Sequence, residues 1–275
     1  MTAYSVLMSV YYKEKAEYLV DAIESMINQT IPPNDFVLVC DGPLTTELDE
    51  VIETYKNKYS SIFQIVRLSE NKGLGLALAE GLLYCKNEIV ARMDSDDISV
   101  LNRMEIQLPV INSNENISVV GGNIAEFVND ISNIICYRNV PCAFEDIRTT
   151  LEFKNPMNHV TTIFRKSHVI AAGNYQTLIG YEDYFLWARL LSQNNKLINI
   201  DMVLCYVRVD DAMYMRRGGL NYFLNAKVLQ KHMYKLGLIT KLQYIRNIFI
   251  RFVSSVLLPN KLRVCLYKRL LRINN

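Results

Sequence analysis

Three carboxylates follow one apolar, strand-like run of this chain. The segment Glu88–Asp97 reads EIVARMDSDD, so Asp94, Asp96 and Asp97 come directly after the apolar residues of the run. Open α/β sheets bind ligands at the carboxyl ends of their strands, and neighbouring carboxylates repel one another unless a cation or hydrogen-bond donors offset their charge. The motif therefore indicates a site for a divalent metal ion.

The same residues have a second interpretation. Asp and Ser are common in turns and at helix N-caps, and a helix is predicted from about Val100 until Pro109 kinks or ends it. Short carboxylate motifs also occur in many chains by chance. The motif alone leaves an acidic turn that caps this helix open beside the metal site.

A second carboxylate pair, Glu182 and Asp183, lies much further along the chain. It precedes the segment YFLWARLLS, whose apolar residues have the spacing of an amphipathic helix. The helix dipole alone favours carboxylates at a helix start. A purely structural role for this pair therefore stays open.

Two polar segments could also contact ligands. Lys72, Gly73 and Gly75 precede helix-spaced leucines, so backbone N–H groups at this helix start could approach an anion, although such a glycine pair is more often only a turn. Residues 155–159, NPMNH, form a polar loop. Within it, His159 could contact an acceptor or be a structural histidine.

The elements that must position these residues alternate between strand and helix. In the first half of the chain, short apolar runs predict strands over residues 4–10, 36–40, 63–68 and 89–93. Amphipathic runs between them predict helices. This alternation is typical of an α/β fold with a parallel sheet.

From Ser118 the pattern changes to shorter and less regular elements. Strands are predicted over residues 119–122, 124–128, 134–140, 161–165, 197–200 and 203–209. The second half is therefore expected to be less regularly wound than the first.

Composition narrows the class of protein. A chain of 275 residues, half of them apolar, can bury a large α/β core, which excludes a disordered or fibrous protein. Its six cysteines are scattered without a C-x-x-C pair, which favours buried thiols in a reducing compartment over a zinc site. No basic region precedes the first apolar run, so we expect no signal peptide and a cytoplasmic protein.

The charge is segregated along the chain. Residues 212–275 contain thirteen of the 30 Lys and Arg residues and none of the 28 Asp and Glu residues, which indicates an anionic partner, either membrane or nucleic acid. Two or three amphipathic helices are predicted from Leu220, with Leu242, Ile245 and Phe249 on one face, and no run is apolar enough to span a bilayer. Helices lying in a membrane interface fit this composition, as do helices packed on the body with a solvated basic face.

Several motifs stand in an order typical of one family. They are SVLMSVYYKEKAEYLVDAIESMINQT, FVLVCDGP, NKGLGLALAEGL, VARMDSDD and GYEDYFLWARLL. Over residues 4–219 the chain resembles the family 2 glycosyltransferases of the GT-A fold, in particular the bacterial enzymes of exopolysaccharide, capsule and O-antigen biosynthesis such as those of the amylovoran type.

The resemblance implies a Rossmann-like, mostly parallel sheet flanked by helices over residues 1–219. Residues 1–117 would form the half that binds the nucleotide sugar, and residues 118–219 the half that binds the acceptor. Residues 220–275 would form a basic amphipathic helical tail that associates with the membrane.

The resemblance also implies a nucleotide-sugar donor and a divalent metal ion, Mn2+ or Mg2+. Asp96 matches the metal ligand of the family's D-x-D motif, Asp94 the contact to ribose or donor sugar, and Asp183 the catalytic base. The other positions implied to line the donor are Ser9, Val10, Tyr11, Glu14, Asp41, Lys72, Gly73, Arg92 and Ser95. Candidates for contacts to the acceptor or the diphosphate are His159, Glu182, Arg216 and Arg217, although the two arginines could equally begin the basic tail.

The expected reaction follows from these roles. Inverting transfer needs a carboxylate to take the acceptor's hydroxyl proton and a metal ion to stabilise the leaving diphosphate. The chain has no Q-x-x-R-W motif and no membrane span, so we expect non-processive transfer of one sugar. The resemblance favours UDP-glucose or UDP-galactose as donor and a saccharide on undecaprenyl diphosphate as acceptor, at the inner face of the cell membrane.

One departure from the family pattern and two alternative functions remain. Cys40-Asp41-Gly42-Pro43 has one acid where many family members have two, so the nucleotide contacts could differ in detail. A sugar nucleotidyltransferase also has metal carboxylates on a nucleotide-binding sheet, but the glycine-rich loop expected after the first strand is missing. A membrane-bound scaffold or nucleic-acid binder would account for the tail but not for the separated carboxylates, so we expect no nucleic acid as partner.

Overall fold

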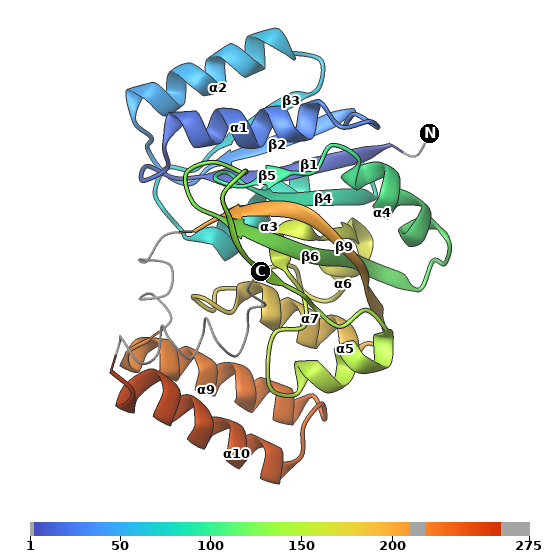
Figure 1. The fold of residues 1–275 in the computed structure, drawn as a ribbon, viewed down its shortest axis with the longest axis vertical. Coiled ribbons are helices and arrows are strands. Elements are labelled where there is room, and N and C mark those ends of the chain that lie inside the picture. Colours follow the sequence, from blue (N-terminus) through green and yellow to red (C-terminus); the bar gives the residue numbers. More distant parts are fainter. Residues whose placement is uncertain (1–2, 210–217, 260–275) are drawn as a thin grey trace.

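The structure is a computed structural model that describes residues 3–209 and 218–259 (Figure 1). Within these residues the strands are β1 (Tyr4–Val10), β2 (Asp35–Cys40), β3 (Phe63–Arg67), β4 (Ile89–Asp94), β5 (Ile98–Ser99), β6 (Ile117–Phe127), β7 (Ile134–Arg138), β8 (Ile163–Arg165) and β9 (Lys196–Arg208). The helices are α1 (Ala16–Ile27), α2 (Thr46–Lys58), α3 (Leu74–Tyr84), α4 (Arg103–Asn112), α5 (Phe144–Leu151), α6 (Lys166–Ala171), α7 (Glu182–Ser192), α9 (Leu220–Lys235) and α10 (Lys241–Phe252), with a 3-10 turn η1 (His159–Thr161) and a π-helical turn η2 (Val253–Leu257). The strands form one sheet in the order β3-β2-β1-β4-β8-β6-β9-β5, and β7 pairs with β6.

The first half of the chain is wound as predicted. β1 pairs in parallel with β2 and β4, and β2 pairs in parallel with β3. Successive side chains of a strand point to opposite faces, and in β2 Leu38 enters one core cluster whereas Val37 and Val39 enter the other. Because both faces are covered, this strand is a continuous apolar run. Beyond β4 the sheet is mixed, since β8 lies antiparallel between β4 and β6.

Two predicted breaks in the second half are wrong. The strands expected over residues 119–122 and 124–128 are one strand, β6, and those expected over 197–200 and 203–209 are one strand, β9. The two strands pair in parallel, with irregular register on either side of Asn123. The sequence features that predicted loops are therefore irregularities within continuous strands, where local pairing is disrupted but the strand goes on.

Two elements differ from prediction at their ends. The strand expected over residues 161–165 begins at Ile163, because the residues before it form η1. The helix expected from Val100 begins at Arg103, and it continues past Pro109 for less than one turn. Proline removes one helical hydrogen bond, so ending soon after it agrees with the predicted disturbance.

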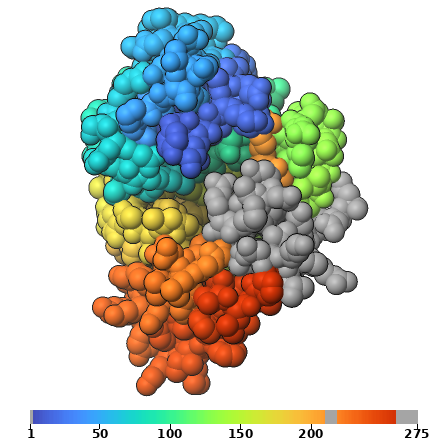
Figure 2. All heavy atoms as spheres, turned by 90° about the vertical axis from the view of Figure 1, so that its left-hand side faces the viewer, coloured from blue at the N-terminus to red at the C-terminus, as the bar shows by residue number. Residues whose placement is uncertain are grey.

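The C-terminal helices α9 and α10 pack against each other at the end of the molecule away from α1 and α2 (Figures 1 and 2). In α9, Ala226, Leu229 and Met233 are buried in the core cluster that also holds the apolar residues of α7. In α10, Leu242 and Phe249 are 81% and 67% exposed. Packing on the body is thus observed for α9, and membrane binding through the tail stays a prediction.

The tail was predicted to contain no membrane span and a second basic helix. Among the described residues, no helix is both long and apolar enough to cross a bilayer. The basic helix expected over residues 261–272 lies outside the described residues, as do Arg216 and Arg217.

Candidate active site

The carboxyl ends of β1, β2 and β4 meet at one edge of the sheet. Ser9 pairs with Asp94, and Val10 with Cys40, so that Asp41 follows β2 at the same level. Val10 is buried, whereas Ser9 and Tyr11 are half-buried. The sheet thus brings together the predicted donor-contacting positions of three strands, at the edge where α/β sheets place their ligands.

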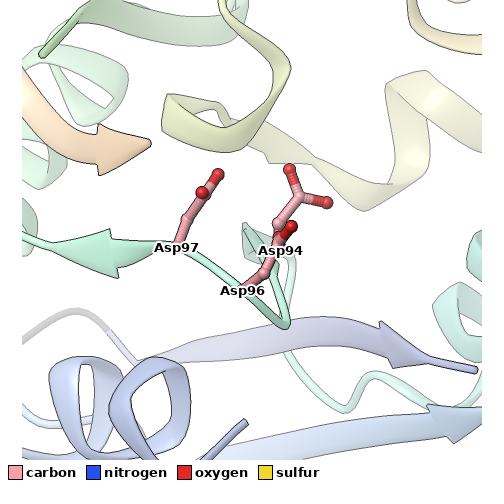
Figure 3. A group of neighbouring side chains, drawn as sticks. All are labelled: Asp94, Asp96 and Asp97. Carbon is pink, nitrogen blue, oxygen red and sulfur yellow. The ribbon is translucent and has the colours of Figure 1, made fainter. Parts of the chain in front are cut away.

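Of the three aspartates of the opening motif, Asp94 ends β4, and Asp96 and Asp97 lie on the turn that leads to β5 (Figure 3). The side chains of Asp94 and Asp97 extend to the same side of this turn, and one oxygen of each of the three carboxylates lies within 4.8 Å of the others. α4 begins only after Asn102, and no side chain caps its first turn. The interpretation of the motif as an acidic helix cap is therefore wrong.

The electrostatics of this turn fit a divalent cation. Arg92, a buried residue of β4, forms an ion pair with Asp94 through its Nη1 and Nη2 atoms. Burial, together with the charges of Asp94 and Glu14, raises the pKa of Asp96 to about 7. Burial and then the charge of Asp96 raise the pKa of Asp97 well above its usual range. Neighbouring carboxylates repel one another when both are ionised. A cation that prefers oxygen ligands, such as Mg2+ or Mn2+, would offset this repulsion.

Neighbouring groups fix the shape of the turn. Ser95 Oγ donates a hydrogen bond to Glu14 Oε2 over 2.9 Å, which brings together two predicted donor-site residues. Arg208, at the end of β9, donates its backbone N–H to Asp97 Oδ1 over 2.9 Å and its Nε to the carbonyl of Asp96 over 3.2 Å. The position of the acidic turn therefore depends on a strand from the second half of the chain.

Asp41 is held by the loop before α3. Its Oδ1 accepts a hydrogen bond from the Lys72 N–H over 2.7 Å, and its Oδ2 accepts one from the Gly73 N–H over 3.0 Å. The backbone N–H groups of Lys72 and Gly73, which were predicted to approach an anion, therefore bind the Asp41 carboxylate in this structure. Gly42 has a φ of 86°, and a Cβ there would lie 2.7 Å from the backbone nitrogen of Asn71. Only glycine fits this close approach without strain.

Asp183 lies in the first turn of α7 with both carboxylate oxygens hydrogen-bonded. Oδ1 accepts from the Tyr184 N–H over 2.7 Å, and Oδ2 accepts from Asn155 Nδ2 over 2.6 Å. Burial raises the pKa of Asp183, and these two hydrogen bonds oppose that rise because they favour the ionised form. A carboxylate with a raised pKa is a suitable proton acceptor.

One cavity of about 590 Å3 connects the two groups of carboxylates. Asp94 and Asp97 line it together with Asp183 and His159, although more than eighty residues of sequence separate the acidic turn from α7. The fold thus places Asp94 and Asp97 of the acidic turn and Asp183 of α7 around one space, while their roles as metal site and base stay predictions.

The acceptor candidates differ in their surroundings. His159 shares a hydrogen bond of 2.9 Å between its Nε2 and the Tyr175 hydroxyl, and its ring packs edge-on against Trp187. Burial, and then the charge of Arg92, lower the pKa of His159 well below its usual range, so the ring is neutral. Glu182 is half-buried, and burial raises its pKa. His159 therefore has a structural partner and also lines the cavity.

The sequence of residues 5–172 shows which family the chain belongs to. Residues 5–172 match the model of glycosyl transferase family 2, which covers more than half of the chain. The chain belongs to this family. It is a glycosyltransferase, so the alternatives of a sugar nucleotidyltransferase and of a non-enzymatic binding protein are wrong.

Three bacterial proteins are similar to this glycosyltransferase over nearly its full length. It is 39% identical to an uncharacterised glycosyltransferase of Haemophilus influenzae, over 98% of this chain and 99% of the relative. It is 36% identical to the amylovoran biosynthesis glycosyltransferase AmsE of Erwinia amylovora, over 97% of this chain and 98% of the relative. It is 32% identical to the UDP-Gal:alpha-D-GlcNAc-diphosphoundecaprenol beta-1,3-galactosyltransferase of Escherichia coli, over 98% and 96%.

Solved structures confirm the GT-A fold. TarS of S. aureus in complex with UDP-GlcNAc matches 98% of this glycosyltransferase and 78% of its own chain, with a TM-score of 0.66 and 18% identity. The mannosyltransferase PcManGT of Pyrobaculum calidifontis, in complex with GDP-Man and Mn2+, matches 95% and 72%, with a TM-score of 0.63 and 15% identity. The predicted α/β fold of the GT-A type is thereby confirmed. Its sheet was predicted to be mostly parallel, and it is parallel in the first half and mixed beyond β4.

Four residues of this glycosyltransferase were missed by sequence reasoning. Asn155 contacts Asp183, Arg208 holds the acidic turn, and Arg138 and Arg251 line the cavity. Asn155 had a weak signal, since it lies in the polar loop that was singled out for His159. The three arginines had no signal in the sequence, because each is a single basic residue within a strand or helix. Only the fold brings them to the site.

Proposed function

We propose that this glycosyltransferase transfers one sugar from a nucleotide sugar to a saccharide acceptor, with inversion at the anomeric carbon. The observation that supports this best is the cavity that Asp94, Asp97 and Asp183 line together. Inverting transfer needs a donor site and a base on either side of one reacting carbon. A single cavity lined by the acidic turn and by Asp183 meets that requirement.

The donor would lie along the edge formed by β1, β2 and β4. Asp41 is the proposed contact to the base, and Asp94, fixed by Arg92, the proposed contact to the ribose or the donor sugar. Ser9 and Tyr11 lie between these two positions along the same edge. The relative from Escherichia coli is named for UDP-Gal, which favours UDP-galactose over UDP-glucose as donor.

Asp96 is the proposed metal ligand, with Asp97 as a second carboxylate on the same turn. Their oxygens lie close enough together for one cation. Burial, and then the charges of neighbouring carboxylates, raise the pKa of both groups, and a bound cation would offset these effects. When bound, Mn2+ or Mg2+ would stabilise the negative charge that gathers on the departing diphosphate.

Asp183 is the proposed catalytic base. A hydroxyl oxygen of the acceptor attacks the anomeric carbon and forms the new glycosidic bond, while the bond from that carbon to the diphosphate oxygen breaks. The hydroxyl proton passes to the Asp183 carboxylate, and the nucleoside diphosphate leaves with the electron pair. Hydrogen bonds from Asn155 and Tyr184 keep this carboxylate oriented toward the cavity in its ionised form.

The proposed acceptor is a saccharide carried on undecaprenyl diphosphate, in the biosynthesis of a surface polysaccharide. Two similar relatives support this through their names, one for amylovoran biosynthesis and one for a diphosphoundecaprenol acceptor. The apolar residues of α10 provide a surface that would hold the enzyme at the inner face of the membrane, with Lys241 and Arg246 exposed beside them. A basic residue near an anionic leaflet contributes about 1 kcal/mol to such binding.

Identification of the product tests this proposal. The enzyme would be incubated with Mn2+, a lipid-linked GlcNAc or GalNAc analogue and a panel of nucleotide sugars. We expect release of UDP from one α-linked donor and a product whose new linkage is β by NMR. A product with the α configuration, or donor hydrolysis without an acceptor product, would contradict the proposed reaction.

A further inference from the structure

The cavity of this glycosyltransferase has a cationic wall beyond Asp183. Arg138 from the end of β7, Lys154 from the loop after α5 and Arg251 from α10 all line it. None of the three belongs to the acidic turn or to the edge of the sheet where the donor is proposed to lie. This part of the cavity therefore has the charge to bind an anion that is not the donor.

The two guanidinium groups of this wall are fixed in place. Arg251 donates from Nη2 to the carbonyl of Phe153 over 2.9 Å, and its guanidinium lies 5.6 Å from the centre of the Tyr181 ring. Tyr181 directly precedes α7, which begins at Glu182 and carries Asp183, so Arg251 is held near the base.

Arg138 is fixed by the loop that also carries Asn155. Its Nη1 donates to Asn158 Oδ1 over 2.6 Å, and its Nη2 donates to the carbonyl of Asn155 over 3.1 Å. Burial raises the pKa of Asp183, and the charge of Arg138 is among the smaller effects that oppose this rise, which agrees with a position close to the base. Preorganised guanidinium groups with several N–H donors suit phosphate oxygens.

The outer rim of the cationic wall is apolar. Phe153 and Ile250 line the cavity, yet they are 48% and 55% exposed. Ile250 belongs to α10, which also exposes Leu242 and Phe249 outside the cavity. Proton acceptor, cations and apolar surface thus occur together in one region, from Asp183 through Arg251 to the face of α10.

We propose that the wall formed by Arg138, Lys154 and Arg251 binds the diphosphate of the acceptor. The inference rests on the proposed function, because it takes the acceptor to be a sugar joined through a diphosphate to a lipid. In such a molecule the reacting sugar, the phosphates and the hydrocarbon chain follow one another in the order in which the base, the cations and the apolar surface occur in the structure. α10 is therefore part of the acceptor site as well as a membrane-facing helix.

Steady-state kinetics with two acceptors test this assignment. One acceptor carries the sugar on a lipid diphosphate, and the other carries the same sugar on a neutral alkyl chain. We expect Lys154→Gln and Arg251→Gln each to raise the KM for the diphosphate acceptor roughly tenfold, the loss expected for one charge-assisted hydrogen bond. The KM for the neutral acceptor and for the donor should stay within about twofold of wild type.

The controls separate the local effect from other causes. Lys231→Gln removes an exposed charge of α9 outside the cavity and should leave both KM values unchanged. Lys154 is exposed and lies in the loop after α5, outside α10, so its variant tests the wall without changing a residue of that helix. An equal rise of KM for both acceptors, or no rise for the diphosphate acceptor, would overturn the assignment. Wild-type enzyme that uses neither acceptor would instead show that the proposed function itself is wrong.

Discussion

Asn155 Nδ2 donates a hydrogen bond to Asp183 Oδ2 over 2.6 Å, so the loop before η1 holds the proposed base on α7. The Asn155 amide is itself oriented, because its Oδ1 accepts a hydrogen bond from the Met157 N–H over 3.1 Å. The amide nitrogen must therefore face Asp183, and the bond favours the ionised carboxylate.

Replacement of Asn155 should change the pH dependence of the reaction. Asp183 must be ionised to accept a proton, so activity is lost as the pH falls through its pKa, which burial has already raised. Asn155→Ala removes a bond that stabilises the ionised form, so we expect the acid limb of the kcat profile to move up by about one pH unit. Activity should recover at high pH, while the donor KM stays unchanged. A uniform loss of kcat at every pH would mean that Asn155 only supports the local structure.

Asp96→Ala should weaken donor binding only when metal is present. Asp96 lies with Asp94 and Asp97 in the proposed metal site, and we expect the donor affinity in Mn2+ to fall at least about tenfold. Calorimetric titration of the donor with and without Mn2+ measures this difference. Glu115→Ala, which removes an exposed carboxylate outside the cavity, should bind the donor like wild type. Equal donor affinity of Asp96→Ala and wild type in Mn2+ would remove Asp96 from the metal site.

Gly42→Ala should destabilise the fold through a close backbone contact. Gly42 has a φ of 86°, and a Cβ would lie 2.7 Å from the Asn71 nitrogen, so both strain and a clash are expected. Gly73 has a similar φ of 83° but no atom within 4 Å of such a Cβ, which makes Gly73→Ala a matched control for strain alone. We expect the free energy of unfolding to fall by about 1–3 kcal/mol in Gly73→Ala and by more in Gly42→Ala. Equal losses in denaturant titrations would show that the contact with Asn71 relaxes easily.

Membrane binding should depend on the exposed face of α10. Removal of the whole tail is a poor test, because α9 buries Leu229 and Met233 in the core. The double variant Leu242→Gln, Phe249→Gln changes only exposed side chains, and it should lower binding to vesicles of phosphatidylcholine and phosphatidylglycerol by at least about tenfold. Leu101→Gln, at an exposed position before α4, serves as control. Equal sedimentation of the double variant and wild type would contradict membrane binding through α10.

The first half of the fold could be predicted because its signals are local. A continuous apolar run such as that of β2 reports burial on both faces, and the amphipathic runs between strands report helices that cover them. The second half could not be delimited as well. In β6 and β9 the pairing continues across irregular positions near Asn123, and that continuity is a property of two strands far apart in sequence.

The site also contains some residues that the sequence indicates locally and others that only the fold brings together. Asp94, Asp96 and Asp97 lie within four consecutive residues, so the sequence alone indicated mutual repulsion of their charges. Asp183 was indicated as a base only by the resemblance to a family. Asn155, Arg208 and Arg251 reach the site through contacts over long sequence distances. Single polar residues in loops, strands or helices carry no local sign of such contacts, so only the fold identifies them.

Asp183 is the proposed base, and it faces the donor carboxylates across one cavity. Asp183→Asn keeps the size of the side chain but cannot accept the proton, so we expect kcat to fall by roughly 10²- to 10⁴-fold. Glu182→Gln, the neighbouring carboxylate, should keep most of the activity.

The decisive measurement combines the release of UDP with the binding of donor by the same Asp183→Asn protein. In the presence of Mn2+ and the lipid-linked acceptor, we predict that this variant binds the donor with wild-type affinity and transfers almost no sugar. Turnover near the wild-type rate would contradict the account, because the base would then have to be another group.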